Sequence, residues 1–243
     1  MAWSDELVAV AARLRDECEA LRFAPPVAYV YNPLAYAFAP YETYLRRYAR
    51  RRPQAVLLGM NPGPYGMMQS GVPFGEIPAV RDWMGIEAPV GQPPRQHPKR
   101  PVEGFACRRR EVSGRRVWGW AQERFGTPEA FFQHFFVLNY CPLLFFDEGG
   151  ENRTPDKLRK EDQIALFEVC DRALAATLRL LEPGAVIGVG RFAEQRAAEV
   201  AAPLSIPVFG VTHPSPANPR AHGGWAPHMD AVLCEAGLKL PAS

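Results

Sequence analysis

The sequence predicts an α/β fold in which a parallel sheet lies between layers of helices. Segments with the spacing of amphipathic helices alternate with short apolar runs that are typical of buried strands. Strands separated by helices in this way pair in parallel, because each return to the sheet needs a long crossover. At 243 residues, 47% of them hydrophobic, the chain can bury a full core, and we expect one domain over residues 1–243.

The helices and strands follow one another in a regular order. Helices are expected at residues 5–21, 41–51, 78–84, 117–125, 159–181, 192–200 and 225–236, and strands at 55–58, 135–138, 185–189 and 206–211. Glu182, Pro183 and Gly184 end the longest helix, because proline cannot continue it. The Pro-rich stretch 88–110 is long for a loop within a compact domain, which favours a functional segment.

The composition excludes several classes of protein. No window of about eighteen apolar residues exists and the N-terminus lacks a basic segment, so we expect neither a membrane span nor a signal peptide, and a cytosolic, nucleoid or nuclear location. The five cysteines are scattered and form no Cys-x-x-Cys pair, which argues against zinc, an iron-sulfur cluster or a disulfide framework. We expect them to be reduced and buried, with no metal or cofactor bound.

A Gly/Pro-rich loop follows the first strand and is called the motif loop below. Residues 59–75 contain five glycines and three prolines in seventeen positions, which excludes regular structure. Open α/β folds bind ligands at the carboxyl ends of their strands, so we interpret this loop as part of a site. Asn61 is its obvious polar group, and Phe74 offers a face on which a planar ligand can stack.

Two further strand ends carry polar side chains. Asn139 follows the strand at 135–138, and His213 follows the strand at 206–211. Since the carboxyl ends of parallel strands lie on one edge, these two residues and Asn61 are expected to converge on one pocket. These loops contain no Ser-His-Asp or Cys-His set and no paired carboxylates. Their absence disfavours acyl transfer and two-carboxylate glycoside hydrolysis.

Positive charge is concentrated in two segments although the net charge is only +2. Five arginines lie between Arg46 and Arg52, and eight Lys or Arg residues between Arg95 and Arg116 face only two glutamates. Such patches attract a polyanion even when the whole protein is near neutral. Because both segments flank the motif loop, the pattern favours nucleic acid over an ordinary solvated surface.

A competing motif lies later in the chain. Residues 188–193 read GVGRFA between a predicted strand and helix, which fits a loose dinucleotide-binding fingerprint. No strand-end acid follows at the spacing that a ribose contact requires, because Gly210 and Val211 stand there. Tight packing of the strand on the helix, with room for a phosphate at the helix N-terminus, is the better interpretation.

Four ordered motifs resemble those of the single-strand-selective monofunctional uracil-DNA glycosylases. They are Gly59-Met60-Asn61-Pro62-Gly63-Pro64, Val72-Pro73-Phe74-Gly75, Asn139-Tyr140-Cys141-Pro142-Leu143 and His213-Pro214-Ser215-Pro216, and further similar stretches include Glu111-Val112-Ser113-Gly114. The resemblance spans nearly the whole chain, from about Tyr29 to Gly237. It implies a uracil-DNA glycosylase-like fold, a three-layer sandwich with a central, mainly parallel sheet flanked by helices.

The resemblance also implies an activity and a set of roles. The expected reaction is hydrolysis of the N-glycosidic bond of uracil, with 5-hydroxymethyluracil as a further substrate, in single- and double-stranded DNA after the base is flipped out. Asn61 would position the attacking water and His213 would donate to the developing charge at uracil O2. Phe74 would stack on the base, Asn139 would read its Watson-Crick edge, and Met60 and Gly63 would complete the pocket, with Gly63 leaving space beside the 5-position.

DNA contacts are expected from the basic segment and from the loop after His213. The residues concerned are Arg108, Arg109, Arg110, Ser215, Asn218 and Arg220. That loop differs from the family pattern, because Ala217 and Gly223 stand where relatives have Arg and Lys, so Arg220 is its one remaining long cationic side chain. We expect a monomer that binds DNA and no membrane. Two alternatives stay open at this point, a noncatalytic nucleic-acid-binding module and a dinucleotide-dependent enzyme.

Overall fold

The computed structural model of the protein describes residues 2–216, 218–219 and 224–238. At its centre, four parallel strands lie in the order β3-β2-β6-β7, which confirms the parallel sheet. Their bounds are β2 (Ala55–Gly59), β3 (Phe135–Asn139), β6 (Val186–Val189) and β7 (Val208–Val211). In the sheet, β3 lies on one side of β2, and β7 lies on the far side of β6. The order therefore reverses between β2 and β6, where open α/β sheets have a ligand-binding crevice.

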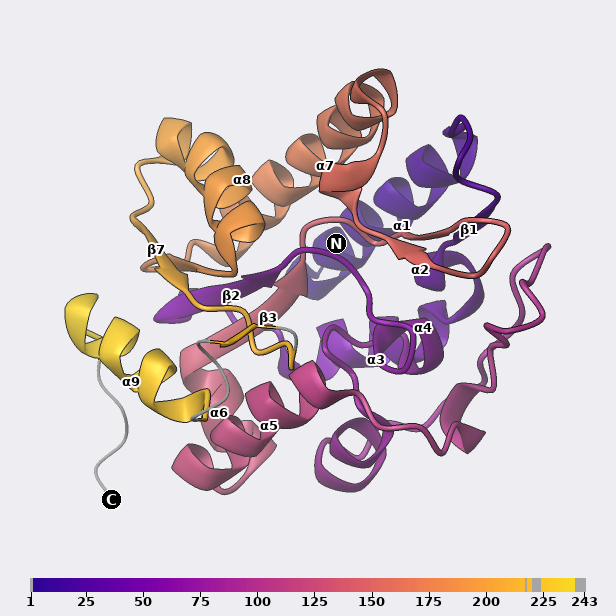
Figure 1. Cartoon of the computed structure of the whole chain (residues 1–243). Coiled ribbons are helices and arrows are strands. Elements are labelled where there is room, and N and C mark those ends of the chain that lie inside the picture. The colour runs from indigo at the N-terminus through magenta and orange to yellow at the C-terminus, as the bar shows by residue number, and fades with distance from the viewer. Residues whose placement is uncertain (1, 217, 220–223, 239–243) are drawn as a thin grey trace.

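Helices cover both faces of this sheet and complete the three layers of the α/β sandwich (Figure 1). One face carries α1 (Trp3–Ala20), α7 (Lys160–Leu181) and α8 (Arg191–Ala201), and the other carries α5 (Val112–Phe125), α6 (Pro128–His134) and α9 (Ala226–Glu235). Aromatic rings fill much of the space between layers. The ring of Tyr44, on α3 (Phe38–Tyr48), stacks on Phe136 of β3 with centroids 5.0 Å apart. Two short helices, α2 (Pro33–Tyr36) and α4 (Met67–Ser70), and a π-helical turn, Ala79–Trp83, also lie in the first half of the chain. Helix α4 lies within residues 59–75, so the expectation that the motif loop contains no regular structure is wrong at that point.

A second, antiparallel sheet lies outside the expectations from the sequence. Its strands, β1 (Tyr29–Tyr31), β4 (Leu144–Phe146) and β5 (Asn152–Arg153), pair in the order β1-β4-β5. Strands of two or three residues are too short to show an alternating pattern, which is why the sequence does not reveal them. This sheet holds the segment that follows Asn139, and so helps to position it.

Helix α5 begins earlier than the sequence pattern predicts, at Val112 rather than at residue 117. The Glu111 side chain caps its N-terminus by accepting a hydrogen bond from the backbone N–H of Ser113 at 3.3 Å. Gly114, which weakens a helix, is required here by packing, since a Cβ at that position would lie 2.0 Å from the carbonyl oxygen of Phe74. The extra turn therefore brings α5 directly against the motif loop.

Two smaller expectations are settled by the structure. Gly188 packs against α8, because a Cβ there would lie 2.3 Å from the backbone of Glu194, which confirms the packing interpretation of residues 188–193. Cys18, Cys107, Cys141 and Cys170 are buried as expected, whereas Cys234 is exposed and corrects that expectation. Within the described residues, no helix is long and apolar enough to cross a membrane.

Candidate active site

The three polar residues predicted to converge do lie on the same edge of the central sheet. Gly59 and Asn139 are register partners at the ends of β2 and β3, so Asn139 sits beside the start of the motif loop. Hydrogen bonds continue past the strands, from Tyr140 N to Gly59 O and from Cys141 N to Met60 O, both at 2.9 Å. His213 follows β7 at the other end of the same edge. Asn61, Asn139 and His213 therefore lie at the carboxyl ends of β2, β3 and β7, on one edge of the sheet.

The ring of Phe74 and the carboxamide of Asn139 meet over Gly59. A Cβ at Gly59 would lie 2.3 Å from Asn139 Oδ1 and 2.7 Å from Phe74 Cε2, so only glycine fits at this strand end. Asn139 Nδ2 donates to Met67 Sδ at 3.3 Å, and because a thioether is a weak acceptor, the amide keeps donor capacity for a ligand. An aromatic face beside a carboxamide is what a planar, hydrogen-bonding base requires.

Phe74 is held in an unusual backbone conformation. Its φ is +52°, in the left-handed region that side chains other than glycine rarely adopt. The carbonyl oxygen of Phe74 accepts hydrogen bonds from Trp118 Nε1 at 3.0 Å and from Glu76 N at 2.8 Å. These hydrogen bonds, one of them from helix α5, hold the strained backbone of Phe74 in place.

The Asn61 side chain is oriented by a single hydrogen bond. Its Nδ2 donates to the carbonyl oxygen of Leu143 at 3.1 Å, just before β4 of the small sheet. This bond fixes which end of the amide carries the donor, and Oδ1 is then the atom that can accept from a water molecule. An amide positioned in this way can orient water, but it cannot take its proton as a carboxylate could.

His213 is held as a neutral imidazole in one tautomer. The backbone N–H of Ser215 donates to His213 Nδ1 at 3.1 Å, so Nδ1 is the unprotonated nitrogen and Nε2 carries the hydrogen. Burial lowers the pKa of His213, which also favours the neutral ring. The ring packs on Gly190, whose φ is +92° and where a Cβ would lie 3.3 Å from His213 Cδ2. The arrangement leaves Nε2–H as a donor toward a ligand.

The loop that carries His213 is fastened at several points. Arg116 of α5 donates through Nη1 to Pro214 O at 2.7 Å, and Trp225 Nε1 donates to Thr212 O at 2.7 Å. Asn218, predicted to contact DNA, donates through Nδ2 to Thr212 Oγ1 and His213 O at 2.7 and 2.9 Å. Its amide therefore serves to hold this loop in the structure. Arg220, the expected cation of the same loop, lies outside the described residues.

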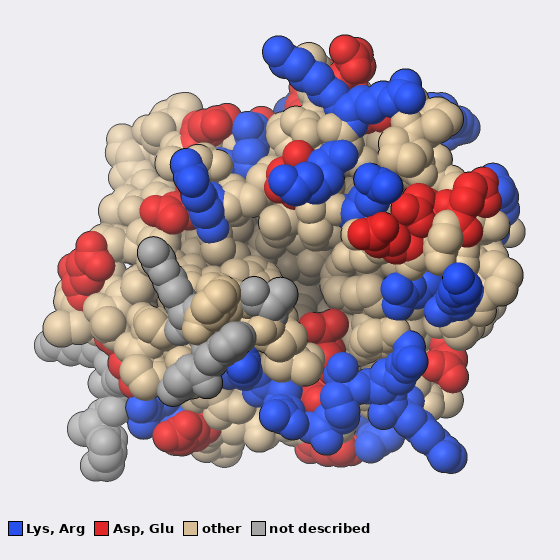
Figure 2. All heavy atoms as spheres, viewed as in Figure 1, with Lys and Arg blue, Asp and Glu red and all other residues tan. Residues whose placement is uncertain are grey.

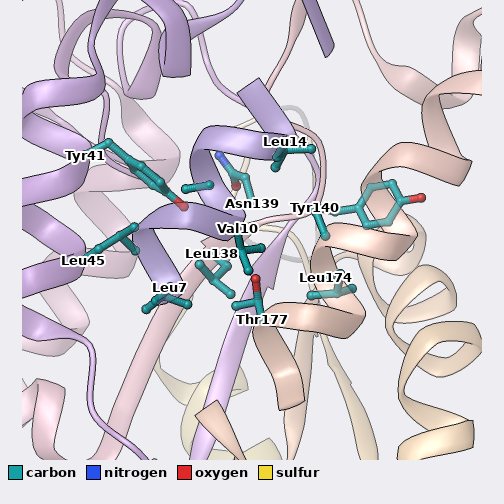
Figure 3. Close-up of a pocket in the computed structure, with 12 residues that line it drawn as sticks. Leu7, Val10, Leu14, Tyr41, Leu45, Leu138, Asn139, Tyr140, Leu174 and Thr177 are labelled. Carbon is teal, nitrogen blue, oxygen red and sulfur yellow. The ribbon is translucent and has the colours of Figure 1, made fainter. Parts of the chain in front are cut away.

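A small cavity lies behind Asn139, on the side of α1, α3 and α7 (Figure 3). Its volume is about 30 Å³ and its walls are mainly apolar, with Leu7, Leu138 and Leu174 among them. A space of this size holds about one water molecule, so it cannot accept a pyrimidine. Figure 3 shows the Tyr140 ring pointing away from Asn139. There Tyr140 Oη donates to Asp171 Oδ1 at 2.7 Å, which anchors the segment from behind.

The face shown in Figure 2 is hollowed near its centre, with a band of Lys and Arg side chains below the hollow. Of the arginines predicted to bind DNA, Arg108 is exposed, Arg109 stacks on the ring of Tyr65 with its guanidinium carbon 4.7 Å from the ring centroid, and Arg110 pairs with Glu76. The Glu76 carboxylate is buried, whereas the Arg110 side chain is 55% exposed, so this ion pair lies at the protein surface. The three arginines therefore differ in how freely they can reach a phosphate.

Three residues that shape this site have no role that the sequence predicts. Glu111 caps α5 and touches the motif loop, Trp118 holds Phe74, and Arg116 holds the His213 loop. Glu111 belongs to a stretch that resembles the glycosylase family, which is the one signal that could have pointed to it. Their contacts join residues that are distant in the sequence, and only the fold brings them together.

Comparison with known proteins identifies the family. The family model described as the uracil DNA glycosylase superfamily matches residues 46–235. The single-strand selective monofunctional uracil DNA glycosylase of Bos taurus is 48% identical over 228 residues, covering 93% of this chain and 84% of that protein. The chain belongs to this family of glycosylases. The corresponding Mus musculus protein is 46% identical, with 93% and 82% coverage, and the family that the motifs indicate is thus confirmed.

A solved structure supports the fold independently. The crystal structure of Pedobacter heparinus SMUG2 matches with a TM-score of 0.66 and 17% identity, over 98% of this chain and 96% of that one. At this identity the likeness concerns the fold alone. It confirms the glycosylase-like α/β sandwich expected from the sequence.

Proposed function

We propose that this protein excises uracil from DNA by hydrolysing the N-glycosidic bond, leaving an abasic site. The observation that carries the proposal is the meeting of the Phe74 ring and the Asn139 carboxamide over Gly59, at the edge that also bears Asn61 and His213. We further propose 5-hydroxymethyluracil as a second substrate. The protein acts as a single-domain monomer on single- and double-stranded DNA, where chromosomal DNA is found.

The Asn139 amide distinguishes uracil from cytosine. Its oxygen accepts from the N3–H of uracil and its nitrogen donates to O4. Cytosine presents the reverse pattern at both atoms and would leave the amide mismatched in a buried site, which is costly. Stacking on Phe74 adds about 1–3 kcal/mol and helps to offset the cost of flipping the nucleotide out of the duplex.

His213 acts on the departing uracil, and Asn61 acts on the attacking water. As the bond from C1′ to N1 breaks, negative charge grows on the uracil and positive charge on the sugar. The Nε2–H of His213 donates to O2, where part of that negative charge develops. Asn61 Oδ1 accepts a hydrogen bond from water and aims its oxygen at C1′; the water then loses a proton to solvent as the new bond forms.

The reaction is expected to need neither a metal nor a cofactor. Within the described residues, no group of three His, Cys, Asp or Glu side chains could hold a metal ion. We predict that purified protein releases uracil from a uracil-containing oligonucleotide, and that EDTA leaves the rate unchanged. Alkaline cleavage followed by gel electrophoresis measures this. Binding of abasic-site DNA without any release of uracil would show a noncatalytic module instead, and loss of turnover with EDTA would contradict the mechanism.

The basic segment is proposed to contact phosphates. Arg108→Ala should weaken binding to DNA of any sequence and lower the slope of log K against log salt by roughly one unit, since one phosphate contact is lost. Arg110→Ala should instead lower the melting temperature, because it leaves the buried Glu76 carboxylate without its partner. Binding titrations at several salt concentrations measure the first effect, and an unchanged slope would make Arg108 ordinary surface.

Arg220 is proposed to fill the gap left by the flipped nucleotide. Filling this gap offsets lost stacking in a duplex and has little to replace in a single strand. Arg220→Ala should therefore lower the single-turnover rate on double-stranded DNA severalfold more than on single-stranded DNA. Equal losses on both substrates would mean that Arg220 contacts only a phosphate.

A further inference from the structure

The carboxylate of Glu111 occupies the space beside Gly63 in the motif loop. A Cβ at Gly63 would lie 2.4 Å from Glu111 Oε2 and 3.0 Å from Cδ, so Glu111 stands where a side chain at residue 63 would begin. The same side chain also packs on Gly66, where a Cβ would lie 3.0 Å from Glu111 Cγ. Because residues 63 and 66 are glycines, the carboxylate of Glu111 can reach the motif loop from α5.

This carboxylate is largely withdrawn from solvent. Burial raises the pKa of Glu111, while backbone hydrogen bonds from Ser113 and Tyr65 oppose that rise. One oxygen, Oε1, accepts from Ser113 N at 3.3 Å in the helix cap, and Oε2 is the oxygen nearest Gly63. Because each carboxylate oxygen has two lone pairs, acceptor capacity remains beside the bonds from Ser113 and Tyr65.

The proposed pose of the base directs its 5-position toward this wall. In a pyrimidine ring, C2 and C5 lie opposite each other. If O2 faces His213, at the β6–β7 end of the crevice, then C5 faces the opposite wall, on the side of the motif loop. Gly63 belongs to the motif loop, and the Glu111 carboxylate lies against it.

Size cannot separate the 5-substituted uracils that such an enzyme meets. The 5-hydroxymethyl group of a damaged base is larger than the 5-methyl group of thymine, so a pocket that admits the former and refuses the latter needs a polar group there. A carboxylate accepts a hydrogen bond from the hydroxyl of a 5-hydroxymethyl group. A 5-methyl group would remove water from the carboxylate without offering a hydrogen bond in its place, which is unfavourable. The carboxylate also repels a formyl group, which offers only an acceptor.

We propose that Glu111 determines which 5-substituted uracils the protein accepts, through a carboxylate oxygen that accepts a hydrogen bond from a donor on the 5-substituent. The inference rests on the proposed function and adds a specificity-determining residue to it. It predicts a preference for 5-hydroxymethyluracil over 5-formyluracil that depends on the charge at this position.

The test is Glu111→Gln, assayed by single-turnover excision of uracil, 5-hydroxymethyluracil and 5-formyluracil from otherwise identical single strands. Glutamine keeps an acceptor for the helix cap, but its amide also offers a donor, which suits the formyl oxygen. We expect the ratio of the 5-hydroxymethyluracil rate to the 5-formyluracil rate to fall about tenfold, the scale of one hydrogen bond to a charged group. The uracil rate of the same variant is the reference for both substituted bases, so that any general loss from the helix cap or the motif loop cancels.

Glu103→Gln is the matched control, since Glu103 is an exposed glutamate before the same helix, and its ratio should equal that of wild type. A second measurement, which does not depend on the chemical step, is the inhibition of uracil excision by the free bases 5-hydroxymethyluracil and 5-formyluracil. Glu111→Gln should reduce the difference between the inhibition constants of these two bases. Equal changes on all three substrates, or an unchanged ratio, would overturn the role of Glu111 and leave it a helix cap. Failure of the wild-type protein to release uracil would overturn the proposed function and this inference with it.

Discussion

His213→Ala and Asn61→Ala should each lower the single-turnover rate of uracil excision by about 10²–10³-fold, the typical effect of removing one preorganised group that acts on developing charge. Binding should change far less, because both groups are assigned mainly to the transition state. The tautomer of His213 is fixed by Ser215 N–H and its pKa is lowered by burial, so the wild-type ring needs no reorganisation before it donates.

The measurement pairs single-turnover rates on uracil-containing DNA with binding to a non-cleavable 2′-fluoro-deoxyuridine oligonucleotide. His134→Ala is the control, because His134 lies at the end of α6, at the opposite edge of the sheet. Phe74→Ala should weaken both rate and binding, since its ring contacts the base in the ground state as well. If the His213 and Asn61 variants lost rate and binding by the same factor, these two residues would have structural roles only.

Gly59→Ala should abolish most of the activity, although it adds a single methyl group. The new Cβ would meet Asn139 Oδ1 at 2.3 Å and Phe74 Cζ at 2.8 Å, so the reading amide and the stacking ring must both move. A displacement of about 1 Å at such a site costs roughly 10²-fold in rate. We expect loss of that size, with weaker binding of uracil-containing DNA.

The same substitution at Gly119 provides a matched control for Gly59. Gly119 lies in α5 with no atom within 4 Å of the space that a Cβ would occupy. Gly119→Ala should keep full activity and stabilise the protein by about 0.5–1 kcal/mol, because alanine favours the helix. Thermal unfolding and excision rates of the two variants measure this contrast. Wild-type activity in a folded Gly59→Ala protein would mean that the base does not bind between Phe74 and Asn139.

The sequence predicts the central sheet and its functional edge because each strand is an apolar run with a clear end. Asn61, Asn139 and His213 follow three such ends, and the rule that parallel strands share one carboxyl edge brings them together. Their roles come from family resemblance, since an asparagine at a strand end is by itself a common turn former. Periodicity and family resemblance together therefore predict which residues lie near the site, but they do not predict the contacts among those residues.

The remaining features depend on tertiary contacts that no local pattern encodes. The first turn of α5 contains Gly114, which looks like a helix breaker until its contact with Phe74 O is seen. Glu111 looks like an ordinary cap until the fold places it at Gly63, on a loop far earlier in the chain. In each case packing decides between two local interpretations.

Hydrolysis of the N-glycosidic bond can be detected as free uracil, by mass spectrometry, after the purified protein is incubated with a single-stranded oligonucleotide that contains one uracil. We expect one uracil and one alkali-labile abasic site for each strand that reacts, with the rate reduced by about 10²-fold or more in Asn61→Ala. Strand-bound uracil that persists at enzyme excess, or excision that is unchanged in Asn61→Ala, would contradict the proposed mechanism.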